Sequence, residues 1–511
     1  MQEILVAKGL YKSYGGVHAL KDFNFVVGSG EIHCLVGENG SGKSTFVKIV
    51  VGAISPDQGE IILNGHHYSH ISPIQAIHEG VQVIYQDLSL FPHMSVAENI
   101  AINRLIAQGK RLVNQREIEN IATEQLSKIG VSLDLFIPVE ELSTANRQIV
   151  AICRALSLDA KILFMDEPTT ALTKVEVDHL LSIVMELKQK GLSVVFISHK
   201  LNEVFEVADI ITILRDGRKV GDFKPQELDY KTLTYYMTGR KVEYPRYKRS
   251  LSDNKPLLEV KNLSRKGNFE NISFKLYPGD IVGLIGLLGS GRTELALTLF
   301  GLNPPDSGEI IVDGTPLKIN SPVEARQLGI GLLPEDRQTK GLFLKKSVKD
   351  NISVTLLEKI TSKLSIINKN FQRSLSHEAV KNMRIVVPDV EAMVQSLSGG
   401  NQQKTIFARW AMTNPKIFIL DSPTVGVDVG SKAEIYELIQ KLASNGIGII
   451  LITDEMPELL ANCNKALVLR NGKVIAQLSE SDLNQADIGD RIQVLISSNG
   501  SSNPIVQREN A

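Results

Sequence analysis

Residues 37–45 read Gly37-Glu38-Asn39-Gly40-Ser41-Gly42-Lys43-Ser44-Thr45, which has the form G-x-x-x-x-G-K-S of a phosphate-binding loop. An apolar run at 31–36, expected to be a buried strand, precedes it, and residues 45–51, expected to be a helix, follow it. In that setting backbone N–H groups curl around phosphate oxygens and the helix N-terminus adds positive charge. Lys43 would reach the β- and γ-phosphates and Ser44 would ligate Mg²⁺. The alternative of a glycine-rich turn without a ligand is disfavoured by the flanking strand and helix.

The second half of the chain repeats the pattern with one change. Gly286-Leu287-Leu288-Gly289-Ser290-Gly291-Arg292-Thr293-Glu294 keeps the glycines but has arginine where the first loop has lysine. Pro56-Asp-Gln-Gly-Glu-Ile-Ile likewise recurs as Pro305-Asp-Ser-Gly-Glu-Ile-Ile. A repeat of about 250 residues, each copy with its own phosphate loop, predicts two homologous domains rather than a solenoid.

The predicted domain limits follow from this repeat. We expect the first domain at 1–238, a linker at 239–256, the second domain at 257–496 and a flexible tail at 497–511. The linker is polar and basic and contains two prolines, which favours a solvated connector over a nucleic-acid or lipid-headgroup patch. Apolar strands alternate with amphipathic helices, for example 175–190 followed by 193–197, so each copy should be an α/β domain with a mainly parallel sheet.

Composition restricts the class of protein. The chain of 511 residues has a net charge of -1, is 43% hydrophobic and 22% charged, and so lacks the basic field of a nucleic-acid-binding protein. Its three scattered cysteines, Cys34, Cys153 and Cys463, are expected to be buried free thiols in a reducing cytoplasm. No signal peptide is expected at the N-terminus, and the apolar run at 447–453 is too short to cross a membrane. Work at a membrane would therefore depend on partners.

Five further positions in the first copy carry candidate chemistry. The strand that precedes Asp166 and Glu167 is apolar, so Asp166 would hold Mg²⁺ and Glu167 would act as the general base on the attacking water. His199 follows another strand and would orient that water, although alone it would read as a surface histidine. Gln86 offers an amide to the metal or the water. Tyr14 would stack on adenine, with an ordinary core or surface role as the alternative.

The motif Leu397-Ser398-Gly399-Gly400-Asn401-Gln402-Gln403-Lys404 resembles the signature of ATP-binding-cassette (ABC) ATPases. The order of phosphate loop, Gln86, signature, Asp166 strand and His199 resembles that family over almost the whole chain. The arginine-containing second loop and Pro334-Glu335-Asp336-Arg337 look like the ATP-binding subunit of monosaccharide importers of the ribose/galactose/xylose type. The implied fold is α/β, with two tandem P-loop ABC ATPase domains, each having a mainly parallel core sheet, an antiparallel β subdomain and a helical signature subdomain.

The resemblance also implies two composite sites, each pairing the phosphate loop of one copy with the signature of the other. Site one would combine loop 37–45, Tyr14, Gln86, Asp166, Glu167 and His199 with Ser398, Gly399, Gly400 and Asn401. Site two would combine Gly286, Gly289, Gly291, Arg292 and Thr293 with residues 142–146, where both signature glycines are lost. In the second copy Ser422 stands at the general-base position, Asp454 at the histidine position and Glu335 at the glutamine position. We therefore expect one hydrolytic site and one that at most binds nucleotide.

The implied cofactors are ATP and Mg²⁺, and the implied partners are two transmembrane permease subunits and, indirectly, an extracytoplasmic solute-binding protein. The chain would lie at the cytoplasmic face of the inner membrane. Segments 88–96 and 340–348 would contact the permease, unless Phe91 and Phe343 belong to the core. The alternatives are a soluble tandem-cassette ATPase acting on ribosomes or nucleic acid, a non-catalytic subunit, and an importer of a nucleoside, autoinducer or polyol. The short linker and the complete first set of motifs argue against the first two.

Overall fold

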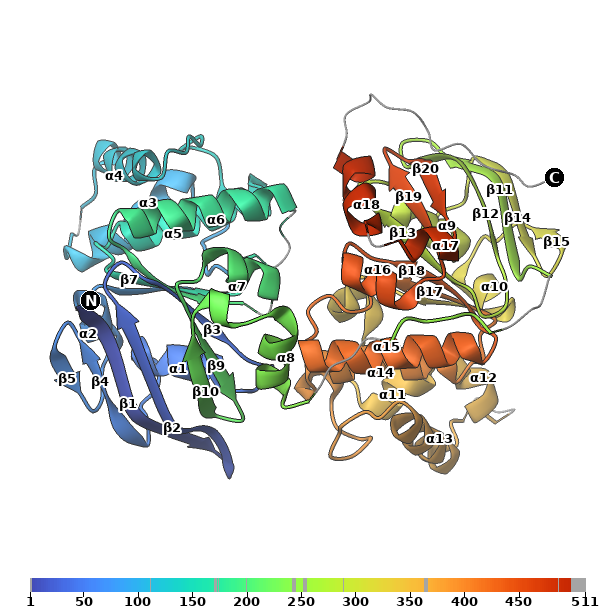
Figure 1. The fold of residues 1–511 in the computed structure, drawn as a ribbon, viewed down its shortest axis with the longest axis horizontal. Helices are drawn as coiled ribbons and strands as arrows, with labels where there is room; N and C mark the ends of the chain where they lie inside the picture. Colours follow the sequence, from blue (N-terminus) through green and yellow to red (C-terminus); the bar gives the residue numbers. More distant parts are fainter. Residues whose placement is uncertain are drawn as a thin grey trace. The chain divides into compact units, whose positions relative to one another are not determined.

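The computed structural model describes residues 2–110, 112–169, 172, 174–198, 200–240, 245–250, 255–287, 289–362, 366–485 and 487–497. The chain divides into two compact units, unit 1 at Met1–Val242 and unit 2 at Glu243–Ala511 (Figure 1). Each unit has its own two sheets and its own helices.

The central sheet of unit 1 has six strands in the order β10-β9-β3-β8-β7-β6. These are β3 (Ile32–Val36), β6 (Val81–Ile84), β7 (Ile162–Asp166), β8 (Ser193–Ile197), β9 (Ile210–Arg215) and β10 (Arg218–Phe223). All neighbouring pairs are parallel except β9 with β10. Strands β3 and β8 are buried along their whole length, as the continuous apolar runs in the sequence require. The carboxyl ends of the parallel strands therefore meet at one edge of the sheet, where the phosphate loop begins.

A second, antiparallel sheet in unit 1 has the order β2-β1-β4-β5. It contains β1 (Glu3–Tyr14), β2 (Val17–Gly28), β4 (Gln58–Leu63) and β5 (His66–Tyr68). Helix α1 (Lys43–Val50) joins the two sheets through Phe46, whose ring lies 5.0 Å from Phe23 and 4.8 Å from Phe25 on β2, and 6.2 Å from Phe164 on β7. The helix that follows the phosphate loop is therefore fixed by the core on both sides.

The remaining helices of unit 1 include a helical subdomain in which α3, α4 and α5 contact one another (Figure 1). Ser95 begins α3 with a capping box formed with Glu98, and Ser143 caps α5. The helices are α2 (Pro73–His78), α3 (Val96–Ala107), α4 (Gln115–Lys128), α5 (Thr144–Leu156), α6 (Lys174–Gln189), α7 (Leu201–Val207) and α8 (Tyr230–Thr238), with 3₁₀ turns at Val139–Glu141 and Pro225–Glu227.

Unit 2 repeats this architecture. Its mainly parallel sheet has the order β16-β17-β18-β13-β19-β20 and its antiparallel sheet the order β12-β11-β14-β15. The strands are β11 (Leu258–Arg265), β12 (Phe269–Leu276), β13 (Ile281–Gly286), β14 (Ser307–Val312), β15 (Thr315–Leu317), β16 (Ile330–Leu333), β17 (Ile417–Asp421), β18 (Gly448–Ile452), β19 (Lys465–Arg470) and β20 (Lys473–Leu478). The predicted α/β fold class, with its antiparallel and helical parts, is confirmed in both units.

The helices of unit 2 begin with α9 (Arg292–Leu299), which follows the second loop as α1 follows the first. The others are α10 (Pro322–Gln327), α11 (Val348–Ser353), α12 (Leu357–Ile360), α13 (Lys369–Asn382), α14 (Gly399–Ala411), α15 (Val429–Ser444), α16 (Met456–Asn462), α17 (Glu480–Leu483) and α18 (Ile488–Ser497). A π-helical turn, η3 (Arg337–Gly341), and 3₁₀ turns at Val354–Leu356 and Val394–Ser396 complete the set.

Part of the segment expected to be a solvated linker instead packs on unit 2. Tyr247 is 5% exposed within the unit 2 core, its hydroxyl donates to the Gly279 carbonyl at 2.8 Å and its N–H to Ala461 O at 2.8 Å. Arg249 donates to Pro278 O at 3.1 Å and pairs with Asp280. The basic composition predicted a solvated connector, but the buried ring of Tyr247 and its two hydrogen bonds hold this part of the segment on unit 2.

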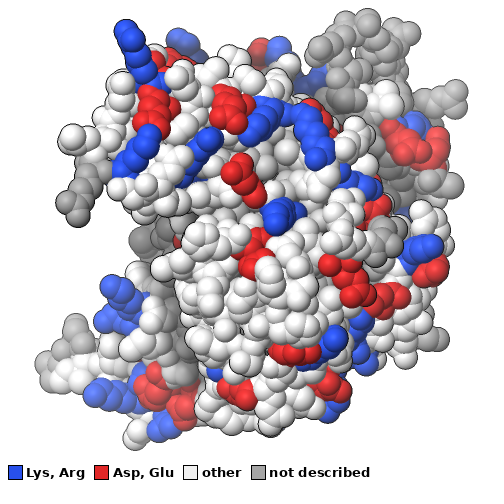
Figure 2. Space-filling view, turned by 90° about the vertical axis from the view of Figure 1, so that its left-hand side faces the viewer, with Lys and Arg blue, Asp and Glu red and all other residues white. Residues whose placement is uncertain are grey.

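Charged side chains of both signs are intermixed on the face of the molecule shown in Figure 2. On the helical subdomain of unit 1, Arg104 pairs with Glu124 at 3.3 Å and Lys128 pairs with the same carboxylate at 2.9 Å. This mixture on the drawn face agrees with the near-zero net charge of the chain.

Candidate nucleotide-binding sites

The first phosphate loop connects the carboxyl end of β3 to α1. Gly40 and Gly42 have φ values of +83° and +114°, and a side chain at Gly42 would place its Cβ 2.4 Å from Ala19 O. A Cβ at Gly37 would lie 2.2 Å from Leu214 O. The glycines are therefore required by the backbone conformation and by the close packing of neighbouring strands. Gly42, the N-cap residue of α1, has no side chain that could cap the helix. The first amides of α1 therefore face the loop.

Lys43 is buried across this loop. Its Nζ donates to Gly37 O at 2.7 Å and to Glu38 O at 2.9 Å, and the residue is 7% exposed. These carbonyls direct the ammonium toward the loop that would surround the phosphates. Ser44, at the start of α1, is exposed.

Asp166 ends β7 at the same edge of the sheet. Burial raises the pKa of its carboxyl group, the neighbouring Glu167 raises it further, and the ammonium of Lys43 opposes the shift. A cation placed beside Asp166 would therefore stabilise its charged form. An oxygen donor set of Ser44, Asp166 and Gln86 fits Mg²⁺, which prefers a few protein oxygens together with phosphate oxygens. Within the described ranges no three His, Cys, Asp or Glu side chains group as a metal site by themselves.

Glu167 stands at a sharp backbone corner directly after β7. Its φ is +49°, and its N–H donates to Ile197 O at 2.9 Å, which holds the corner against the end of β8. A non-glycine residue in this conformation costs about 1–3 kcal/mol and persists because the surrounding structure imposes it. Ser422 in unit 2 has the same corner, with φ +50° and a 2.9 Å bond from its N–H to Ile452 O. At this corner the two units share their backbone conformation, and unit 2 has a serine side chain where unit 1 has a carboxylate.

Gln86 follows β6, and Tyr14 ends β1. β6 pairs with β7 so that Ile84 lies beside Met165, and Gln86 therefore leaves the sheet at the same edge as Asp166. Tyr14 ends β1 with 48% of its surface exposed, and the Nζ of Lys12 lies 5.7 Å from its ring centroid. An accessible ring of this kind is available for stacking. His199 lies outside the described residues.

The second phosphate loop has the same backbone but a different charged side chain. Gly289 and Gly291 have φ values of +78° and +92°, and a Cβ at Gly286 would lie 2.2 Å from Leu469 O. Arg292 is 7% exposed and extends beyond its own loop. It donates to Leu287 O at 3.2 Å and to Thr453 O at 3.1 Å, and it forms an ion pair with Asp454. The arginine therefore links this loop to the segment after β18.

Asp421 occupies the position of Asp166 in unit 2. Burial raises the pKa of its carboxyl group to about 6, against the opposing effects of Thr293 and Arg292. The proximity of Thr293 and Asp421 shows that the strand end and the loop meet in unit 2 as the motif order predicts.

The two signature segments differ in how their helices begin. In unit 1 the Ser143 hydroxyl accepts from Asn146 N at 3.2 Å and so caps its own helix, α5. In unit 2 the Ser398 hydroxyl caps no amide of α14 and instead accepts from the side chain of Asn401 at 3.0 Å. The first amides of α14 are therefore not occupied by Ser398 and face outward, which is the arrangement that binds an anion.

Both signature glycines of unit 2 are required by packing. A Cβ at Gly400 would lie 2.5 Å from Ser431 Oγ, and a Cβ at Gly399 would lie 2.8 Å from Arg337 Nη2 and 2.9 Å from Gly426 O. The α14 start is therefore closely packed against the loop after β17.

Sequence reasoning missed a buried Thr–Glu pair that occurs in both units. Thr169 Oγ1 donates to Glu203 at 2.7 Å, and Ser198 Oγ donates to the same carboxylate at 3.1 Å. In unit 2, Thr424 donates to Glu458 at 2.9 Å. The pair joins the segment after Glu167 to the helix after β8. Its signal was present in the sequence, since the threonine and the glutamate recur with equal spacing in both copies.

Phe91 and Phe343 do not belong to the core, which resolves one alternative left open by the sequence. Their exposed fractions are 46% and 56%. Buried Asn99 accepts from Phe91 N at 2.9 Å, and buried Asn351 accepts from Phe343 N at 2.9 Å. Each segment is therefore anchored by its backbone while its aromatic ring remains at the surface.

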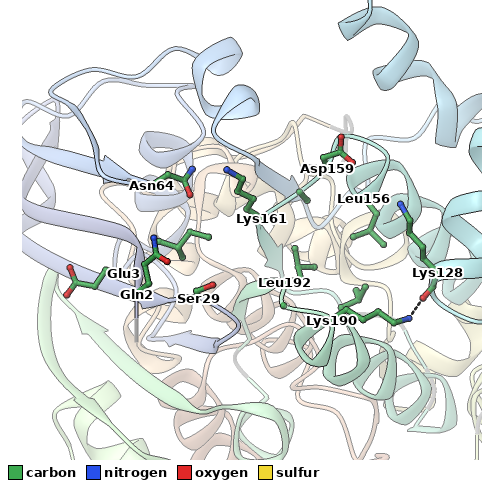
Figure 3. Close-up of a pocket in the computed structure, with 14 residues that line it drawn as sticks. Gln2, Glu3, Ser29, Asn64, Lys128, Leu156, Asp159, Lys161, Lys190 and Leu192 are labelled. Atoms are coloured by element: carbon green, nitrogen blue, oxygen red, sulfur yellow. Dashed lines mark hydrogen bonds between the residues drawn. The ribbon is translucent and has the colours of Figure 1, made fainter.

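A cavity of about 500 Å³ in unit 1 lies away from these loops (Figure 3). Ser29, Lys161 and Leu192, which line it, precede β3, β7 and β8. It therefore opens at the amino ends of the parallel strands, whereas the phosphate loop and Asp166 lie at their carboxyl ends. The hydrogen bond from Lys190 to Lys128 O closes one side of it. This cavity is therefore separate from the candidate nucleotide site.

The profile of the family described as ABC transporter matches residues 20–170 and 269–425, one segment in each unit. The chain belongs to the ABC transporter family. It has two ABC ATPase cassettes in tandem, cassette 1 in unit 1 and cassette 2 in unit 2, so the family, fold and enzyme class predicted from the motifs are confirmed.

Several relatives match nearly the whole length of this ABC protein. Ribose import ATP-binding protein RbsA 1 of Rubrobacter xylanophilus is 41% identical over 95% of this chain and 97% of the relative. Ribose import ATP-binding protein RbsA of Geobacillus kaustophilus is 40% identical over 94% of this chain and 97% of the relative. A protein of Pseudomonas syringae pv. tomato, named for ribose/galactose/methyl galactoside import, is 41% identical over 95% and 92%.

Among solved structures, a nucleotide-free ATP-binding cassette from an ABC transporter is 24% identical, covering 46% of this chain and 99% of that chain with a TM-score of 0.41. None of the helices in the described part of the chain is both long enough and apolar enough to span a membrane.

Proposed function

We propose that the protein is the ATP-hydrolysing subunit of a monosaccharide importer and has one hydrolytic and one degenerate nucleotide site. The observation that carries this is the asymmetry between the cassettes. Lys43, Asp166 and Glu167 occupy one sheet edge in cassette 1, while cassette 2 has Arg292 paired with Asp454 and Ser422 at the corner. The near full-length relatives named for ribose and galactose import support the sugar assignment.

In the proposed hydrolytic site, Ser398, Gly399, Gly400 and Asn401 of cassette 2 complete the phosphate-binding surface of cassette 1. Two features support this pairing. The loop of cassette 1 offers amides and one ammonium, and the outward amides at the start of α14 offer a second anion-binding surface. Both surfaces attract the negative charge of the γ-phosphate. Bringing the cassette 2 signature onto the cassette 1 loop would therefore require bound ATP.

Within that site the residues have separate roles. Lys43 binds the β- and γ-phosphates and withdraws charge from them, Tyr14 stacks on the base, and Ser44, Gln86 and Asp166 would hold Mg²⁺. When bound, Mg²⁺ would neutralise the charge that develops on the phosphate oxygens. Glu167 accepts a proton from the attacking water, and His199 orients that water. A general base in this role contributes about 10²–10⁴-fold in rate.

The proposed second site binds nucleotide at most, through Gly286, Gly289, Gly291, Arg292 and Thr293. A planar guanidinium already engaged by a carboxylate does not replace the compact ammonium of lysine. Ser422 has no carboxylate to take a proton from water at the position where cassette 1 has Glu167. The role of cassette 2 in hydrolysis would then be to supply its intact signature to the site of cassette 1.

The proposed partners are two transmembrane permease subunits and, indirectly, an extracytoplasmic solute-binding protein, with the chain at the cytoplasmic face of the inner membrane. The exposed rings of Phe91 and Phe343 support contact with the permease, since each sits on an anchored surface segment of its cassette.

The test is ATP turnover by the assembled transporter in liposomes, with radiolabelled ribose, galactose and xylose offered in turn. Glu167→Gln and Lys43→Ala should abolish turnover, while Arg292→Ala should only reduce it. Equal loss from Arg292→Ala, with nucleotide still bound at cassette 1, would mean that both sites hydrolyse. Sugar-independent turnover with no uptake of any tested sugar would refute the monosaccharide assignment.

A further inference from the structure

Arg337 uses all of its guanidinium nitrogens to join three segments of cassette 2. Nη1 donates to Val425 O at 2.7 Å, Nη2 to Gly426 O at 3.1 Å, and Nε to Gln402 Oε1 at 3.4 Å. Partial burial lowers the pKa of this side chain, and its neighbour Asp336 opposes the shift. A planar fork can satisfy acceptors on different segments at once, which a single ammonium cannot do with the same geometry.

One of the three acceptors lies in the signature and the other two lie in a loop packed against it. Val425 and Gly426 belong to the loop that follows β17 and the Ser422 corner, and Gln402 lies in the first turn of α14. Gln402 in turn donates to Leu397 O at 3.2 Å and to Val394 O at 3.3 Å. Arg337 therefore positions Gln402, whose side chain holds the backbone at Val394 and Leu397, just before the signature serine.

Contact with the signature itself is equally close. A Cβ at Gly399 would lie 2.8 Å from Nη2 of Arg337, so the guanidinium lies directly against the backbone of the first signature glycine. The same fork lies 3.2 Å from the Cβ position of Gly426, which has a φ of +65°. The side chain fills the space that two glycines leave open.

The turn carrying Arg337 is held at both ends. Asp336 Oδ1 accepts from Gln338 N and Thr339 N, both at 3.0 Å, which starts the π-helical turn η3. At the far end Arg409 Nη1 donates to Gly341 O at 2.6 Å. Two residues further along the chain is exposed Phe343. Arg409 joins this surface segment to the last turn of α14 directly, whereas Arg337 joins it to the signature at the start of the helix.

Cassette 1 has no counterpart of this contact among its described residues. Leu88 occupies the position equivalent to Arg337, since it lies two residues after Gln86 as Arg337 lies two residues after Glu335. The carbonyls of Leu88 and Ser89 accept hydrogen bonds from Arg154 on α5, both at 2.8 Å. Arg154 corresponds to Arg409, which cassette 2 also has. The additional arginine thus occurs in the copy that retains the signature glycines.

We propose that Arg337 is a positioning residue for ATP hydrolysis: it sets the signature of cassette 2 in the geometry that receives the γ-phosphate and couples it to the surface segment ending in Phe343. This rests on the proposed function, in which that signature completes the site of cassette 1. Arg337 belongs to cassette 2 and is not part of the first phosphate loop, so its effect should fall on the catalytic step and leave ATP binding to that loop intact.

The test compares Arg337→Ala and Arg337→Lys with Arg326→Ala in the assembled transporter. Arg326 is a matched control, because it also donates to a carbonyl, Thr355 O at 2.7 Å, and to a carboxylate, Glu358 at 2.7 Å, but lies apart from the signature. Both Arg337 variants should lower kcat for ATP by about tenfold or more with KM changed less than about threefold, and Arg326→Ala should leave both nearly unchanged. Lysine should not rescue, since it cannot span the three acceptors.

Hydrogen–deuterium exchange at residues 399–402 gives a second readout, measured with ATP in the Glu167→Gln background. ATP should protect these amides in the parent, and Arg337→Ala or Arg337→Lys should remove most of that protection. Wild-type kcat together with normal protection in either variant would overturn the proposal. If Arg337→Ala fails to fold, Arg337→Lys decides, because it keeps the charge and most of the aliphatic part of the side chain. Turnover that survives Glu167→Gln alone would refute the proposed hydrolytic site instead.

Discussion

Arg292 and Asp454 form an ion pair that joins two of the positions at which cassette 2 departs from cassette 1. The guanidinium also donates to Thr453 O at 3.1 Å, so it is held by the end of β18. Two substitutions that look like separate losses in the sequence therefore form one contact. A phosphate approaching this loop must compete with the Asp454 carboxylate for the same cation.

Asp454→Asn should strengthen nucleotide binding to cassette 2 by about three- to tenfold, because it frees the arginine of a competing charge. The measurement is ATP binding by calorimetry in the Lys43→Ala background, which weakens binding to cassette 1. Glu455→Gln is the control, since it removes a neighbouring carboxylate that pairs with Lys432 rather than with Arg292. Unchanged affinity in Asp454→Asn would show that the ion pair does not limit binding.

Ser422→Glu should not restore turnover to the Glu167→Gln protein. The backbone corner would accept the glutamate, since Ser422 and Glu167 share their positive φ and their bond to the end of the adjacent strand. Arg292 would still be engaged and the cassette 1 signature would still lack its glycines. ATPase turnover above about one tenth of the parent value would contradict this expectation.

Gly400→Ala should destabilise cassette 2 by about 1–3 kcal/mol and reduce turnover, because its Cβ would lie 2.5 Å from Ser431 Oγ. Adding Ser431→Gly removes the clashing atoms and should recover part of both losses. The double-mutant cycle is measured by chemical unfolding and by ATPase turnover. Strictly additive losses would mean that the two positions do not conflict.

The stability of cassette 2 should fall as pH rises toward neutrality, in part because of Glu458. Burial, with a smaller contribution from Glu455, raises the pKa of this carboxyl group to about 7. The folded state then holds a proton that the unfolded state has released between the ordinary glutamate pKa and about 7, so stability falls across that window and levels above it.

Glu458→Gln keeps an oxygen for the Thr424 hydroxyl but cannot ionise. It should flatten the pH dependence of the melting temperature between pH 5 and pH 8 and raise that temperature most at the alkaline end. Parallel profiles for the parent and the variant would show that Glu458 does not titrate in this range. Asp421, whose pKa is also raised by burial, contributes a slope of the same sign and remains in both proteins.

The sequence predicted the elements whose position follows from motif order. The loop before α1, the acidic end of β7 and the signature at α14 lie in the predicted setting, because each motif is continuous in the sequence and the strands it follows are parallel. These features require no knowledge of distant contacts.

Contacts between distant segments could not be predicted in this way. Arg292 meets Asp454 because β13 pairs with β18, a pairing that brings together residues far apart in the chain. Arg337 likewise reaches a loop and a helix that lie much later in the sequence. The surface position of Phe91 and Phe343 depends on buried asparagines of the following helices, and aromatic composition alone suggested core and surface equally.

The burial of Tyr247 in unit 2 determines where a separate fragment of cassette 2 should begin. Its ring and hydroxyl, together with Arg249, complete the surface formed by residues 278–280 and Ala461. A fragment of cassette 2 that started at residue 257 would expose apolar surface and leave the Gly279 carbonyl without this donor. Expression of the cassette on its own would therefore need to start at or before Pro245, and a protease that cuts after residue 250 would release a less stable fragment than one that cuts before it.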